Sequence, residues 1–91
     1  MQQDTTKILQ LKKAIGKVFN KLRLENTNAS ISKFAREFDI DRGNLSKIER
    51  GKLSCSLVMA WKIVEASNVK FSVFAKLLEE ELGEDFKLID E

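Results

Sequence analysis

The sequence predicts an all-α fold, a small domain built from five helices. Apolar residues make up 43% of the 91 residues, which is enough for one hydrophobic core. They recur at intervals of three and four residues, the period of a helix with one buried face. The chain contains no proline, repeat, low-complexity tract or linker. We therefore expect one domain over residues 1–82, followed by a C-terminal tail over residues 83–91.

The first helix is predicted from about Thr5 to Leu24 and is longer than the others. Its inner face carries apolar residues at helical spacing, namely Ile8, Leu11, Ile15, Val18 and Leu22. Gly16 lowers the helix propensity but permits close packing. The part before Ile15 is either a longer helix on its own core or a partner surface, and Glu25 to Ala29 is predicted to be a polar loop.

Two short helices joined by a tight turn are predicted over residues 30–52. Ser30 is a good N-cap for the first helix, whose inner face carries Ile31, Phe34, Ala35 and Phe38. The pattern breaks at Asp39, which can adopt the left-handed conformation that ends a helix. Asp41 is expected to cap the second helix, and Gly51 is expected to end it.

A fourth helix is predicted after its N-cap Ser56, with an inner face formed by Leu57, Ala60, Trp61 and Val64. Asn68 is expected in the left-handed conformation between the fourth helix and the fifth. The fifth helix begins near Phe71 and ends near Gly83. The tail that follows carries the apolar residues Phe86, Leu88 and Ile89. This tail is either frayed, or a strand or arm that contacts a second subunit.

The pair of short helices suggests a function. A helix, a tight turn and a second helix form the DNA-reading unit of many small regulators, although an ordinary helical hairpin has the same outline. The residues Phe34-Ala35, Phe38, Ile40, Leu45-Ser46, Ile48-Glu49 and Gly51-Lys52 resemble the signature of the lambda-repressor-like helix-turn-helix family, also called the Cro-type or XRE family. The resemblance extends over roughly residues 15–82. It implies a five-helix domain that binds double-stranded DNA.

The outer face of the second short helix holds the candidate base contacts. Leu45 and Ile48 define its inner side, and a rotation of ~100° per residue turns other positions outward. The predicted base contacts are Arg42, Gly43, Ser46 and Lys47. The resemblance marks the same positions. Arginine and lysine can donate to guanine O6 and N7 or to a phosphate.

The predicted phosphate contacts flank this face. They are Ser30, Ser32, Lys33, Asn44, Arg50 and Lys52. The family often has glutamine where this chain has Ile31, so that side-chain contact is lost or moves to Ser32 or Lys33. Arg23 and Glu49 match a pair that joins the first and third helices in phage repressors of this family. We interpret them as a structural ion pair.

Charge and composition limit the other classes. Residues 1–52 hold twelve Lys and Arg against six Asp and Glu, a net charge of +6, whereas residues 53–91 hold four against eight, a net charge of −4. The basic half suits a polyanionic partner. The chain has no histidine and one cysteine. A structural zinc site is therefore excluded, and a nucleophile would lack an imidazole base. We expect no metal, no cofactor, no enzymatic activity and no membrane span, and a cytoplasmic location.

The sequence thus predicts a sequence-specific DNA-binding transcriptional regulator. We expect a homodimeric repressor that reads the major groove of a palindromic operator with its third helix. Two alternatives that involve a protein partner stay open. One is an antitoxin that binds a toxin and represses its own operon. The other is an adaptor that keeps the fold without DNA binding, which the acidic second half and the missing glutamine favour.

Overall fold

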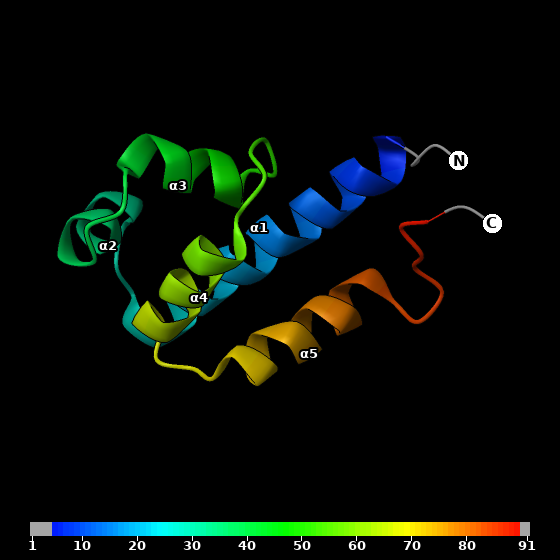
Figure 1. Ribbon diagram of the computed structural model, residues 1–91. Coiled ribbons are helices and arrows are strands. Elements are labelled where there is room, and N and C mark those ends of the chain that lie inside the picture. The colour runs from blue at the N-terminus through cyan, green and yellow to red at the C-terminus, as the bar shows by residue number, and fades with distance from the viewer. Residues whose placement is uncertain (1–4, 90–91) are drawn as a thin grey trace.

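The computed structural model describes residues 5–89, and within that range it contains five α-helices and no strand (Figure 1). The helices are α1 (Thr5–Thr27), α2 (Ile31–Glu37), α3 (Arg42–Glu49), α4 (Leu57–Ala66) and α5 (Phe71–Leu82). The predicted all-α class and the five-helix order are confirmed. Residues 1–4 of the predicted domain and residues 90–91 of the predicted tail lie outside the described residues.

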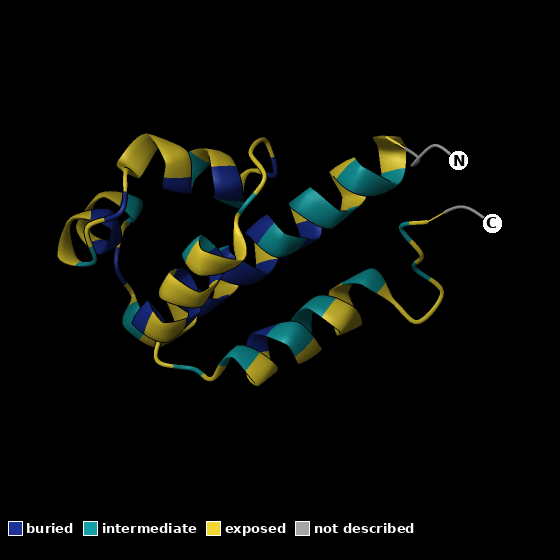
Figure 2. Ribbon diagram, viewed as in Figure 1, coloured by how far each residue is buried: buried dark blue, intermediate teal, exposed yellow. Residues whose placement is uncertain are grey.

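The long helix α1 is the element on which the rest of the chain packs. It contacts α3, α4 and α5, and α2 packs against α3. Figure 2 shows that the buried positions of α1 lie where these helices meet it. The fully buried side chains include Phe19 of α1, Phe34 of α2, Leu45 of α3 and Ile63 of α4. One core therefore joins the α2–α3 pair to the other helices.

Three of the helix starts follow the predicted capping residues. Ser30 Oγ accepts from the backbone N–H of Lys33 at 3.1 Å, and Asp41 Oδ1 accepts from the N–H of Asn44 at 2.8 Å. Ser56 Oγ accepts from the N–H of Met59 at 3.1 Å. Each side chain satisfies one backbone donor that the first turn of a helix leaves without a partner.

The turns use left-handed residues, as the sequence predicts at two positions. Asp39 has φ 54° and Asn68 has φ 63°. A third residue, Asn28 with φ 52°, was not anticipated, because α1 continues to Thr27 instead of ending near Leu24. The polar residues from Glu25 onward lie on the last exposed turn of α1. The hydroxyl of Thr27 donates to the Arg23 carbonyl oxygen at 2.6 Å and extends the helix.

The predicted inner face of α4 is wrong in part. Ala60 and Val64 are buried as expected, but Ile63 is buried beside them, whereas Leu57 and Trp61 are 67% and 54% exposed. The buried positions are separated by three and four residues, so they define a face that leaves Leu57 and Trp61 on its flank. An apolar surface on α4 consequently faces solvent.

The tail folds back toward the first helix. Leu88 lines a hollow of about 240 Å³ together with Ile8 and Leu11 of α1 and with Cys55. Phe86 and Leu88 are half-buried, and Ile89 is 65% exposed. Burial raises the pKa of the Cys55 thiol, which therefore stays protonated near neutral pH. No helix within residues 5–89 is long and apolar enough to cross a membrane.

Candidate DNA-binding interface

The turn between α2 and α3 is fixed by buried residues within it and by a hydrogen bond from α4. Ile40 in the turn is buried, and its backbone N–H donates to the Ala35 carbonyl oxygen at 2.8 Å. Ala35 is also buried, so a small side chain stands where the two helices approach. From α4, Lys62 Nζ donates to the Asp39 carbonyl oxygen at 2.9 Å. These contacts fix the angle of α3 relative to α2.

An ion pair fixes the other end of α3 to α1. Arg23 Nε donates to Glu49 Oε2 at 2.8 Å, and Arg23 Nη2 donates to Glu49 Oε1 at 2.9 Å. The two side chains are only 5% and 4% exposed. Asn20 donates a third hydrogen bond to Glu49 at 3.0 Å, and the remaining Arg23 nitrogen donates to the Ala29 carbonyl oxygen. The charges are therefore paired and hydrogen-bonded on every side, which a buried pair requires.

Two glycines let α3 approach α1 at this end. A Cβ atom on Gly16 would lie 2.4 Å from the carbonyl oxygens of both Ile48 and Glu49. Gly51 has φ 74°, and a Cβ atom there would lie 2.9 Å from the Lys13 Cα atom. The backbones of α1 and of the α3 terminus are thus in contact. This contact requires glycine at positions 16 and 51, since any side chain there would force the two backbones apart.

The outer face of α3 is open by contrast. Arg42, Gly43 and Lys47 are exposed, and Ser46 is half-buried. Lys47 makes no side-chain hydrogen bond or ion pair with any of residues 5–89. A Cβ atom on Gly43 would meet only the carboxylate of Asp41, at 3.3 Å. The four predicted base contacts therefore share one accessible strip of helix.

Arg42, one of these four residues, is hydrogen-bonded to a residue of α2. Arg42 Nε donates to Ser32 Oγ at 2.6 Å, so a predicted base contact is hydrogen-bonded to a predicted phosphate contact. Sequence spacing does not reveal this link, because the two residues belong to different helices. It places the guanidinium at the edge of the α3 strip nearest α2, with its terminal nitrogens still available to donate.

The other predicted phosphate contacts lie at the N-terminus of α2, on α3 and directly after α3. Ser30, Lys33, Asn44, Arg50 and Lys52 are all exposed. Lys33 is 3.9 Å from Glu37, an exposed pair that contributes little. Arg50 Nε donates to the Ser46 carbonyl oxygen at 3.3 Å, which lays its side chain along the end of α3. The structure thus leaves each of these predicted phosphate contacts accessible to a ligand.

Two residues of this region were missed in the sequence. Asn20 shares the Glu49 carboxylate, and Lys62 holds the turn at Asp39. The position of Asn20 was a usable signal, because it lies three residues before Arg23 and four after Gly16 on one side of α1. Lys62 gave no signal, since its partner is a backbone oxygen distant in sequence.

The fold and this arrangement define a helix-turn-helix protein whose third helix presents its outer face to solvent. No model of a known protein family matches the chain. The chain is similar to Control protein C.MunI of Mycoplasma sp, with 37% identity over 71 residues that cover 78% of this chain and 96% of that protein. The chain belongs to the family of this control protein.

Proposed function

We propose that the protein is a sequence-specific DNA-binding transcriptional regulator that reads the major groove with α3. The observation that carries this proposal is the strip formed by Arg42, Gly43, Ser46 and Lys47, which is accessible while the opposite side of α3 is buried. The major groove is ~12 Å wide, which admits a helix of this kind. Similarity to a control protein supports the same function.

The side chains on the strip and beside it divide into two roles, contacts with bases and contacts with phosphates. Lys47 and Arg42 carry donors long enough to reach base edges, while Arg50 and Lys52 follow the end of α3 and face the backbone. Gly43 lets the helix lie close to the groove. Ser30, Ser32 and Lys33 offer donors to the neighbouring phosphates. We assign that role to the side chains of the N-cap and of the first turn of α2.

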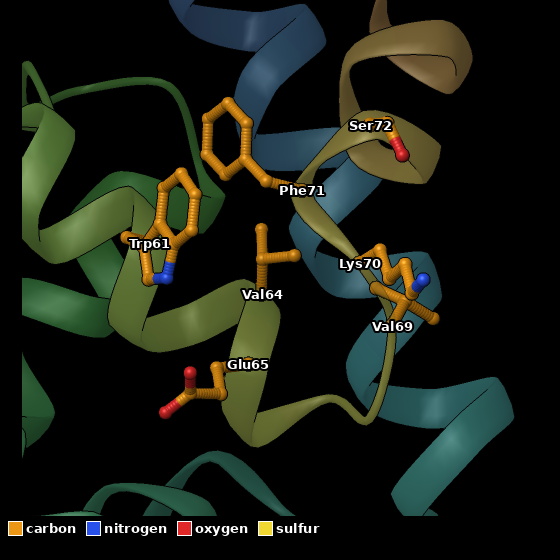
Figure 3. A pocket seen from close by; sticks show the side chains of 7 residues that line it. All are labelled: Trp61, Val64, Glu65, Val69, Lys70, Phe71 and Ser72. Atoms are coloured by element: carbon orange, nitrogen blue, oxygen red, sulfur yellow. The ribbon is translucent and has the colours of Figure 1, made fainter.

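We further propose that the regulator is a homodimer that represses transcription from a palindromic operator. One α3 covers only a few base pairs, and two symmetric copies would place their helices ~34 Å apart. The exposed apolar residues Leu57, Val58 and Trp61 offer a surface for this contact, in addition to the tail. In Figure 3, Trp61 lies beside Phe71 at the edge of a hollow of about 410 Å³, and the two stacked rings have their centroids 4.9 Å apart.

Substitution of one residue from each role tests DNA reading. Operator sequences are first selected from random DNA by binding to the wild-type protein. On them, Lys47→Ala should relax the preference at one or two positions, because a base contact gives ~1–3 kcal/mol of discrimination. Lys52→Ala should weaken binding to all sequences alike and reduce the slope of log K against log salt by about 1.

The control for both variants is an unchanged helical spectrum and melting temperature. If Lys47→Ala and Lys52→Ala both weaken binding evenly, α3 does not read bases. If the wild-type protein selects no DNA sequence, the proposal of sequence-specific DNA binding fails, and a function that involves a protein partner replaces it. In that second candidate, an antitoxin or an adaptor, the apolar face of α4 would bind the partner protein instead of a second copy of the chain.

The dimer has its own test. Val58 is 81% exposed, so Val58→Asp should leave the fold intact and should dissociate a dimer that uses α4. Ile89→Asp tests the tail in the same way. Light scattering of the wild-type protein and of the two variants assigns the interface. A wild-type protein that stays monomeric at high micromolar concentration, and that protects a single half-site, contradicts the dimer.

A further inference from the structure

The two chain segments that meet beside the α3 terminus present no negative charge of their own to solvent. From Thr5 to Leu24 every charged residue is Lys or Arg. From Arg42 to Lys62 the single acidic residue is Glu49, and its carboxylate is turned inward against Arg23 with 4% exposure. Burial of that ion pair therefore removes the one negative charge that segment 42–62 could present to solvent.

Cations from α1 and from the α3 terminus are brought together on this surface. Gly51 lies against the backbone of Lys13, which places Lys13 next to both Arg50 and Lys52. Lys12 lines a hollow with Leu53 and Ser54, the residues that follow Lys52. We call Lys12, Lys13, Arg50 and Lys52 the terminus cluster. Figure 1 shows the loop after α3 beside the N-terminal half of α1.

The terminus cluster is not neutralised by the described part of the chain. None of its side chains forms an ion pair with any of residues 5–89. Glu81 lines the same hollow as Lys13, but it is bonded to Lys17 at 2.9 Å. Four like charges held together by a rigid backbone contact repel one another. An anionic ligand would relieve that repulsion.

We propose that Lys12 and Lys13 of the extended α1 form a second phosphate-binding site beside the contacts assigned to Arg50 and Lys52, and that these lysines hold DNA backbone that α3 itself does not reach. The ligand is the phosphodiester backbone of the same duplex, so the inference rests on the proposed function. The extension of α1 before Ile15 then contributes to binding, and it does so without reading sequence.

Neutralising the two α1 lysines tests this site. The double variant Lys12→Gln/Lys13→Gln is titrated on the selected operator over a range of salt concentrations. Each lost phosphate contact should lower the slope of log K against log salt by about 0.9, which is roughly a five-fold weaker Kd at 0.15 M salt for each contact. Preference among operator variants should not change. Duplexes carrying single neutral methylphosphonates should show which phosphates the variant no longer senses.

A matched control removes two positive charges elsewhere. Lys21 and Lys76 are exposed and line hollows that also contain Glu80. Lys21→Gln/Lys76→Gln therefore makes the same change in net charge away from the terminus cluster. We expect its salt slope to equal that of the wild-type protein.

The outcomes separate the two proposals. Sequence preference with an unchanged slope in Lys12→Gln/Lys13→Gln overturns the second phosphate site and leaves the proposed function intact. An equal fall of the slope in the control variant also overturns it, since net charge alone would then explain the loss. If the wild-type protein prefers no DNA sequence, the proposed function fails, and the second phosphate site fails with it.

Discussion

The two sides of α3 differ in how far the rest of the chain determines them. The side toward α1 has Glu49 bound by Arg23 and Asn20, and its backbone touches Gly16. On the outer side, Lys47 has no partner among the described residues, and Gly43 faces almost open space. One helix of eight residues therefore carries a structural joint and an open surface.

This difference predicts whether a substitution should change the stability of the protein or its affinity for a ligand. Residues of the α1–α3 joint satisfy one another, so their loss should appear in the free energy of unfolding. Residues of the outer strip gain partners only when a ligand binds, so their loss should appear in affinity while stability stays nearly constant. Measurements of stability and of DNA binding on the same variants therefore test whether the two sides of α3 have these separate roles.

The largest effect is expected at the buried ion pair. Arg23→Ala would leave the Glu49 carboxylate buried with Asn20 as its one remaining side-chain partner. Removing one member of such a pair costs ~3–5 kcal/mol in the free energy of unfolding. Denaturant unfolding followed by circular dichroism measures this loss. The exposed Lys21→Ala on the same helix is the control, with a change within ~0.5 kcal/mol.

A double-mutant cycle sharpens that result. If the pair is coupled, the double variant Arg23→Ala/Glu49→Ala should lose much less stability than the two single losses together. Arg23 also donates to the Ala29 carbonyl oxygen, so Arg23 retains this one hydrogen bond in the Glu49→Ala variant. Additive losses in the cycle would show that the two side chains do not depend on each other.

Gly16 at the α1–α3 joint and Gly43 on the outer strip form a matched pair with opposite expectations. Gly16→Ala places a methyl group 2.4 Å from two backbone oxygens of α3, which cannot move aside as a side chain can. We expect a loss of about 2 kcal/mol in unfolding free energy, because overpacking outweighs the ~1 kcal/mol that alanine contributes to helix propensity. Gly43→Ala should keep or slightly raise stability and should weaken DNA binding.

Thermal melts and operator titrations of the two glycine variants give the answer together. A Gly43→Ala protein that binds the operator as well as the wild-type protein would show that the outer strip does not approach DNA closely. A Gly16→Ala protein with an unchanged melting temperature would mean that α1 and α3 can separate without cost.

Much of the fold was predictable because it depends on local chemistry. Ser30, Asp41 and Ser56 cap the helices as their side chains suggest, and Asp39 and Asn68 take the left-handed conformation. The errors also have a physical cause. Leu57 and Trp61 are apolar, but apolar spacing cannot reveal which flank of α4 the neighbouring helices leave uncovered.

The candidate site was predictable only as a face. Helical rotation turns Arg42, Gly43, Ser46 and Lys47 outward whatever else the chain does. The bond from Arg42 to Ser32 and the contact of Gly51 with Lys13 join segments that are distant in sequence. Such contacts depend on how helices cross. The single sequence therefore indicates which residues of α3 face outward, and the three-dimensional arrangement is needed to group them with residues of the other helices.

The smallest effect is expected at the one contact that links the outer strip to α2. Ser32→Ala removes the acceptor for Arg42 Nε, and both residues are exposed, so stability should change by less than ~0.5 kcal/mol. If Ser32 holds the guanidinium ready for a base, its loss should weaken operator binding by ~0.5–1.5 kcal/mol, the net value of one hydrogen bond. That is about two- to ten-fold in Kd, with the change confined to the operator position that Arg42→Ala also relaxes.

Ser30→Ala serves as the comparison, since loss of the N-cap should lower stability by ~1 kcal/mol and lower affinity evenly for all sequences. Unchanged affinity of Ser32→Ala beside a clear loss in Arg42→Ala would show that Arg42 leaves Ser32 when DNA binds.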